Sequence, residues 1–156
     1  MIAVDTNLLV YAHREDSEWH EAAARCLKGL AEGRAAWAIP WPCIHEFLAI
    51  VTHPRIYRPP SPMAVAVTQV EAWLESPHVL LLAEAAGHWA RLRGLISQGR
   101  TAGPAVHDAR IAALCLDHGV HELWSADRDF SRFPDLPARN PLVATDTAPV
   151  SDTRRG

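Results

Sequence analysis

Residues 1–13 read MIAVDTNLLVYAH, in which a short apolar run ends at an aspartate and passes directly into a helix-forming stretch. The residues from Ile2 to Val4 are apolar at every position, which is typical of a strand covered on both faces by other elements. Residues 7–13 then read as a short helix. We therefore expect a buried first strand that places Asp5 at the carboxyl edge of a parallel sheet, where α/β proteins bind their ligands.

The rest of the chain repeats this alternation of apolar runs and helical stretches. Further strands are expected at residues 35–39, 79–83, 122–125 and 142–144. Helices are expected between them, the first with Ser17 as its N-terminal cap, at residues 17–33, 42–53, 62–76, 85–98 and 104–119. Strands joined by helices of this length need crossover connections, which favour parallel pairing. The predicted fold is α/β, a three-layer α/β/α sandwich with a mainly parallel central sheet.

Length and composition are those of one ordinary globular domain. The chain has 156 residues, of which 49% are hydrophobic and 21% charged. The net charge of −3 excludes the generally basic surface of proteins that bind nucleic acid over their whole surface. Any nucleic-acid contact must come from a local basic patch or from bound cations. Residues 1–145 are predicted to form the domain, and residues 146–156, which hold few apolar side chains, a flexible tail.

The sequence shows no sign of export or of membrane insertion. Three cysteines, Cys26, Cys43 and Cys115, are widely spaced and contain no CxxC pair, which favours buried free thiols in a reducing compartment. The N-terminus lacks the basic and long apolar segments of a signal peptide. The most apolar stretch, residues 35–53, is interrupted by two prolines and a glutamate. We expect a cytoplasmic protein without membrane association.

Acidic residues follow two of the predicted strands. Asp5 comes directly after the first strand, and Asp127 comes after the fourth, with Asp129 two residues later. Parallel strands end at the same edge of a sheet, so these carboxylates are expected to lie close together. Each aspartate alone could equally well cap the helix or turn that follows it.

Two further acids lie on apolar helical faces. Glu46 is the only residue with a formal charge between positions 37 and 52, and an ionised carboxylate there is costly unless paired or bound to metal. Asp108 shares its helical face with Ile111, Ala112 and Cys115. The alternatives are a buried ion pair with an arginine for Glu46 and an interaction with the helix N-terminus for Asp108.

A divalent cation would explain all four acids together. Clustered carboxylates repel one another strongly, and a hard cation such as Mg²⁺ or Mn²⁺ relieves that repulsion through oxygen ligands. Such a site is suited to hydrolysis of a phosphodiester, because the metal orients the phosphate and lowers the pKa of bound water. No nucleophilic side chain is required.

The order and spacing of these motifs resemble the PIN-domain ribonucleases, and most of all the VapC toxins of bacterial toxin–antitoxin pairs. The resemblance extends from Ile2 to about Val143. The motifs that carry it are Asp5-Thr6-Asn7 after the first strand, the isolated Glu46, Asp108 at the start of a late helix, and Ser125-Ala126-Asp127-Arg128-Asp129-Phe130.

The resemblance implies an endoribonuclease that depends on Mg²⁺ or Mn²⁺ and cleaves RNA at selected sites. It also implies a homodimer and a small antitoxin partner. The matched acidic positions, which would be catalytic and would hold the metal, are Asp5, Glu46, Asp108 and Asp127. Asp129 is assigned to the metal or its immediate surroundings. The matched supporting residues are Thr6, Asn7 and Ser125.

Two other functions stay open at this point. A PIN-like module could bind RNA or protein without cleaving it. A haloacid-dehalogenase-like phosphatase also has an aspartate after its first strand, but its second acid, two residues later, is Asn7 here. A zinc protease motif is excluded because His45-Glu46 is followed by Ala49 where a second histidine would stand.

Two surfaces are candidates for contact with partners. The helix at residues 62–76 carries more apolar side chains than one core requires, and a dimer or antitoxin contact is expected on Val65, Val67, Val70, Trp73 and Leu74. Arg55 and Arg58 lie on a proline-rich loop and could contact RNA phosphates.

Overall fold

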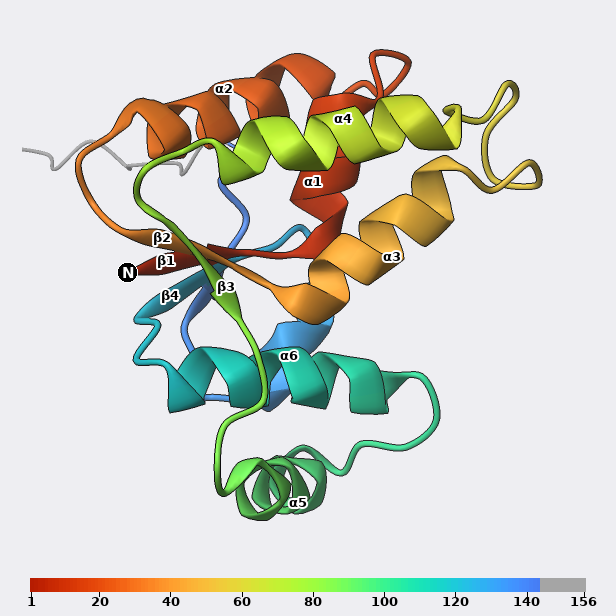
Figure 1. The fold of residues 1–156 in the computed structure, drawn as a ribbon. Coiled ribbons are helices and arrows are strands. Elements are labelled where there is room, and N and C mark those ends of the chain that lie inside the picture. Colours follow the sequence, from red (N-terminus) through yellow and green to blue (C-terminus); the bar gives the residue numbers. More distant parts are fainter. Residues whose placement is uncertain (144–156) are drawn as a thin grey trace, which may run out of the picture.

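A computed structural model of the chain describes residues 1–143, and one parallel sheet runs through the middle of this region (Figure 1). Within these residues the sheet has five strands in the order β3-β2-β1-β4-β5. Every pair of neighbours is parallel. The strands are β1 (Ile2–Val4), β2 (Trp37–Pro40), β3 (Val79–Leu82), β4 (Glu122–Trp124) and β5 (Ala138–Arg139). The predicted α/β class and its parallel sheet are confirmed.

Helices cover both faces of the sheet, as the predicted three layers require (Figure 1). One face carries α1 (Thr6–His13), α2 (His20–Glu32), α3 (Trp41–Val51) and α4 (Met63–Leu74). The other carries α5 (His88–Gly99) and α6 (Ala105–Asp117). A short 3-10 helix, η1 (Arg128–Arg132), follows β4. Within the described part of the chain, no helix is long and apolar enough to cross a membrane.

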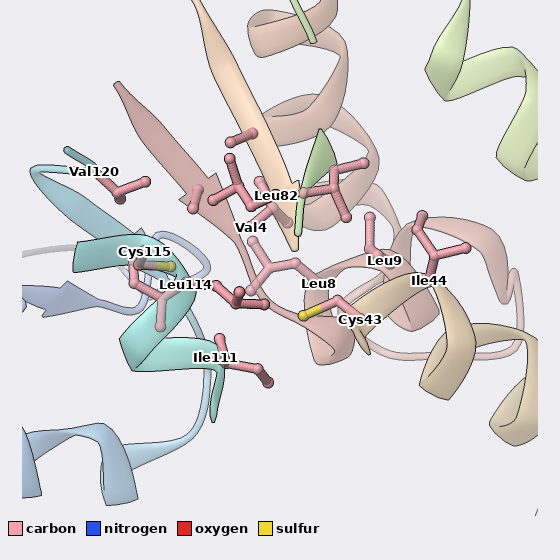
Figure 2. Packing of buried hydrophobic residues seen from close by; sticks show 14 of the residues in the cluster. Val4, Leu8, Leu9, Cys43, Ile44, Leu82, Ile111, Leu114, Cys115 and Val120 are labelled. Carbon is pink, nitrogen blue, oxygen red and sulfur yellow. The ribbon is translucent and has the colours of Figure 1, made fainter. Parts of the chain in front are cut away.

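The core lies on both sides of β1. Ala3 and Val4 have no exposed surface, which is the physical reason why this strand is apolar at consecutive positions. Figure 2 shows side chains of this core, among them Leu8 and Leu9 of α1, Ile44 of α3 and Ile111 of α6. Burying each such aliphatic side chain stabilises the fold by about 1.5–3 kcal/mol. Cys43 and Cys115 are buried free thiols within this core, and Cys26 is a half-buried one.

Two details of the predicted elements are wrong. The fifth strand is β5, not residues 142–144: Leu123 and Ser125 donate backbone hydrogen bonds to Pro137 and Arg139. The chain turns at Asn140, whose side chain accepts a bond from the Leu142 amide, so the apolar run after it does not pair. Ala144, and with it the predicted tail, lies outside the described residues.

The start of α2 is the second difference. Trp19 stands at the helix N-cap. The Ser17 hydroxyl instead accepts a hydrogen bond of 3.1 Å from the Trp19 amide, within the turn that precedes the helix. The serine thus stabilises a turn rather than the helix terminus.

The order of the strands determines where a site can form. The chain leaves β1 toward β2 and β3 on one side and returns to β4 on the other. The carboxyl ends of β1 and β4 therefore lie at the point where the direction of the connections reverses, which is the preferred ligand site of open α/β sheets. The Asp5 amide donates to the Trp124 carbonyl at 3.0 Å and holds these two ends together.

Candidate active site: an acidic cleft at the ends of β1 and β4

Asp5 is the most enclosed carboxylate of the site, with 5% of its surface exposed. It is the N-cap of α1, and its Oδ1 accepts from the Thr6 amide at 2.8 Å. Oδ2 accepts from the Ser125 hydroxyl at 2.7 Å and from the Asn7 amide group at 3.1 Å. The Cys43 thiol donates to Oδ1 at 3.7 Å. Both oxygens are thereby fixed in orientation.

Ser125 and Asn7 tie the β1 and β4 ends together. The Ser125 hydroxyl donates to Asp5 and accepts from the Asn7 side chain at 3.1 Å and from the Asp127 amide at 3.0 Å. This uses its single donor and both acceptor positions. The Asn7 side-chain carbonyl also accepts from the Ala126 amide at 3.0 Å. The residues predicted to support Asp5 all lie in contact with it or with its partners.

Glu46 reaches the same place from α3. Its Oε2 accepts a hydrogen bond of 2.9 Å from the buried Thr6 hydroxyl, directly beside Asp5. Among the described residues, no arginine or lysine forms a salt bridge with Glu46. The ion-pair explanation of this isolated charge is therefore not what the structure shows, and the carboxylate faces other acids instead.

Three aspartates form the tightest acidic group. Asp108, in the first turn of α6, and Asp127 and Asp129, at the start of η1, each offer an oxygen within 4.8 Å of the others. Oδ1 of Asp127 accepts from the Asp129 amide at 2.8 Å, which sets the direction of this turn. Asp129 is exposed, whereas the other two are half-buried.

A cavity of about 300 Å³ connects the four predicted acids. Asp5, Glu46, Asp108 and Asp127 all line it, together with Thr6, Asn7, Val10, Tyr11, Ile50 and Tyr57. Asp129 is the only predicted acid that does not, and Ser125 supports the site from beneath. We call this cavity the acidic cleft.

Burial and the repulsion between neighbouring carboxylates raise the pKa of two of these acids, Asp108 and Asp5. Burial above all, then the charges of Asp127, Asp5, Asp129 and Glu46, raises the pKa of Asp108 to about 6 from 3.8. Burial also raises the pKa of Asp5, with Glu46 adding to it, while the bonds from Ser125 and Thr6 oppose the change. A site that holds so much negative charge is suited to a cation.

Some residues of the cleft had no sequence signal. Tyr11 and Ile50 are half-buried residues on helices that also pack into the core, and Tyr57 lies in a proline-rich loop. Their place in the cleft follows from tertiary packing and not from a local pattern. His13, at the end of α1, lies outside the cleft and bonds Ser61, which precedes α4, at 2.9 Å.

A family model described as "PIN domain" matches residues 2–136. The chain belongs to the PIN-domain family. Ribonuclease VapC48 of Mycobacterium tuberculosis is 33% identical to this PIN domain over 138 residues, which are 88% of this chain and 95% of that protein. The predicted resemblance to VapC ribonucleases is thus confirmed by a curated relative that is matched almost end to end.

Solved structures share the fold of this PIN domain. The structure of VapBC2 from Rickettsia felis, bound to a DNA fragment from their promoter, has a TM-score of 0.64 at 19% identity and covers 90% of this chain and 98% of that one. VapC20 of Mycobacterium tuberculosis, described as a sarcin–ricin loop cleaving toxin, has a TM-score of 0.62 at 18% identity, with 84% and 93% covered.

Proposed function

We infer that this PIN domain is a VapC-type endoribonuclease, the toxin of a toxin–antitoxin pair, which cleaves RNA phosphodiester bonds with the help of Mg²⁺ or Mn²⁺. The observation that carries this inference is the convergence of Asp5, Glu46, Asp108 and Asp127 on one cleft from four different elements. Family membership and the curated VapC relative support the same conclusion.

The residues of the cleft fit a divalent metal ion. The donors are carboxylate oxygens, which Mg²⁺ and Mn²⁺ prefer, and oxygens of Asp108, Asp127 and the adjoining Asp129 lie within 4.8 Å of one another. The ligands we propose are Asp108 and Asp127, with Asp5 and Glu46 lining the same cleft and Asp129 at its outer side. The bound ion would orient the phosphate, activate water and stabilise the leaving oxygen.

The protein's own groups supply position and a proton acceptor. Ser125, Asn7 and the Thr6 amide keep Asp5 from turning away from its neighbours. Oε2 of Glu46 is held by the Thr6 hydroxyl, so Oε1 is the oxygen left to take a proton from an attacking water. Because the acids repel phosphate as well as one another, RNA binds productively only when the charge of the cleft is neutralised.

The proposed partners are RNA, a small antitoxin protein and a second copy of this chain. VapBC2, a relative in fold, was solved as a complex. The dimer is supported by apolar side chains on the outer face of α4, where Met63, Val65 and Val67 are 53%, 51% and 40% exposed. Val70 and Trp73 of the predicted contact set face the core instead. We place the activity in the cytoplasm, where its RNA substrate is.

The phosphatase alternative fits the structure poorly. Asn7 occupies the position of that chemistry's second acid, and its amide group donates to Asp5 and Ser125. An amide in this role holds Asp5 in place but cannot give a proton to a leaving group.

Cleavage of a single-stranded RNA tests the proposed function. Wild type should cut it with Mg²⁺ or Mn²⁺ and stop when a chelator is added. Asp127→Asn should lose at least about 100-fold in rate because it removes one negative charge from the acidic group that would hold the metal. Asp135→Asn makes the same chemical change at an exposed position outside the cleft and should cleave like wild type. Cleavage that persists in chelator, or in Asp127→Asn, contradicts the proposal.

A further inference from the structure

The side chains that line the acidic cleft become less polar with distance from the sheet. Asp5 and Glu46 lie near the strand ends, at the start of α1 and in the middle of α3. Val10 and Tyr11 follow Asp5 by more than a turn of α1, and Ile50 follows Glu46 by one turn of α3. The cleft therefore has a charged inner part and an apolar, aromatic outer part.

Tyr57 completes this outer part from the loop between α3 and α4. It is half-buried and lines the cleft, although it is 52 positions away from Asp5 in sequence. Burial raises the pKa of its hydroxyl above the ordinary value of 10.0, so the ring stays uncharged near neutral pH. An uncharged aromatic ring adds nothing to the repulsion among the acids and offers a flat apolar surface.

Arg14 holds this ring in place. Its guanidinium lies over the Tyr57 ring, with Cζ 4.2 Å from the ring centroid. The side chain of Arg14 is only 12% exposed, and it forms two bonds with Asp16, of 2.8 and 2.6 Å. The same group donates to the Pro59 carbonyl at 3.1 Å and to the Ser61 hydroxyl at 3.2 Å. A paired arginine therefore anchors both the ring and its loop.

The position of Arg14 determines which face of the Tyr57 ring a ligand in the cleft can contact. The guanidinium occupies one face of the ring, so a ligand in the cleft meets the opposite face or the ring edge. A phosphate is repelled by the neighbouring carboxylates. A nucleobase is uncharged and flat, and stacking on a tyrosine is one of the common ways in which proteins hold single-stranded nucleic acid.

We propose that Tyr57 forms a base-stacking subsite beside the acidic group, which holds one nucleobase next to the phosphodiester to be cut, and that Arg14 is a positioning residue for that ring. The subsite rests on the proposed ribonuclease function. The subsite would recognise a part of the substrate that the acids do not. That part is the base of a single-stranded nucleotide, which is free to leave its own stack. Double-stranded RNA, whose bases are paired, would not enter it.

Steady-state cleavage of a short RNA with a mapped cut site tests the subsite. Tyr57→Leu should raise KM and lower kcat/KM by about 5- to 100-fold, the range expected for loss of one stacked base, with kcat little changed. Tyr57→Phe keeps the ring and should retain the low KM that Tyr57→Leu loses. Arg14→Gln should raise KM in the same direction, whereas Arg91→Gln, which breaks a comparable ion pair on α5, should not.

An abasic nucleotide identifies the stacked base. Placed in turn on either side of the cut, it should lower kcat/KM of wild type at one position by a factor similar to that of Tyr57→Leu. At that position, Tyr57→Leu should lose nothing further. If the two losses multiply at every position, or if Tyr57→Leu lowers kcat alone, the subsite is wrong while the ribonuclease function stands. If wild type cuts no RNA with either metal, both the subsite and the ribonuclease function are wrong.

Discussion

The hydroxyl of Ser125 donates to Oδ2 of Asp5 at 2.7 Å and so links two residues that are 120 positions apart. Ser125→Ala removes this donor from a buried carboxylate and should lower the free energy of unfolding by about 1–3 kcal/mol. Urea unfolding in a chelator measures the loss. Ser97→Ala, at an exposed position on α5, is the control and should stay within about 0.5 kcal/mol of wild type. Equal stability of the two variants would argue against a structural role for this bond.

The stability of the metal-free protein should depend on Asp108 between pH 7 and pH 5. The pKa of this group is raised from 3.8 to about 6, so the folded protein takes up a proton in this window, while the unfolded chain does so only near pH 4. Stability contributed by the protonated form is therefore gained as the pH falls through 6 and is absent above it. Because Asp108 is partly exposed, the gain should be about 1–2 kcal/mol.

Asp108→Asn tests the same repulsion between carboxylates at a fixed pH. In a chelator at pH 7 it should be more stable than wild type by a similar amount, since the charge opposed by its neighbours is gone. The extra stability should shrink as the pH falls from 7 to 5 and vanish only near pH 4, where the unfolded chain also takes up the proton. Asp135→Asn should keep the pH dependence of wild type. Parallel stability curves for wild type and Asp108→Asn across this range would refute the expected repulsion.

Removing the charge of Glu46 should lower the cleavage rate without lowering the stability of the fold. Glu46→Gln keeps an oxygen that can accept from the Thr6 hydroxyl but cannot take a proton, so cleavage should slow by about 100- to 10,000-fold with little change in thermal midpoint. Thr6→Val, which only frees the carboxylate to turn, should slow cleavage less. Thr6→Ser restores the hydroxyl and should recover most of the rate. Full activity in Glu46→Gln is the result that would exclude it as the proton acceptor.

Arg55 and Arg58 flank Tyr57 on the exposed loop, in a position to meet RNA phosphates outside the cleft. Binding measured in an Asp127→Asn background, where RNA stays intact, should weaken when both become glutamine. The slope of log Kd against log salt should shrink by about 1.4 for two contacts to a single strand. Arg25 and Arg93 are exposed on other helices, and their double glutamine variant should leave the slope as it is. An unchanged slope in the loop variant would remove these arginines from the RNA path.

The outer face of α4 should carry the proposed dimer contact. Val65, which is 51% exposed, becomes charged in Val65→Glu without any cost to the core. Light scattering at micromolar concentration should show a dimer for wild type and a monomer for this variant. Ala35→Glu, at an exposed position before β2, is the control and should remain dimeric. A monomeric wild type would contradict the dimer directly.

The sequence predicted the charged part of the cleft because simple physical rules govern it. Parallel strands end at a common edge, so Asp5 and Asp127 had to meet if the sheet was parallel. A lone charge within an apolar helix needs a compensating partner, and this singled out Glu46. Asp108 could be placed because its helical neighbours are apolar. Each of these residues carries its signal in its immediate surroundings.

The parts that sequence reasoning missed have no such local signal. The strand β5 is two exposed residues at the edge of the sheet, and its pairing depends on β4 and not on its own composition. Tyr57 lines the cleft through tertiary contacts, among them the Arg14 guanidinium that lies over its ring. Ser17 has the chemistry of a helix cap, but the turn that follows it delays the helix to His20.

The acids of the cleft come from both ends of the chain, and this has a consequence during synthesis. A growing polypeptide that has left the ribosome only as far as β3 carries Asp5 and Glu46 but not yet Asp108 or Asp127. It also lacks Ser125, which holds Asp5 in place. The acidic cleft of such a chain stays incomplete until its last crossover has been made and has docked against the sheet.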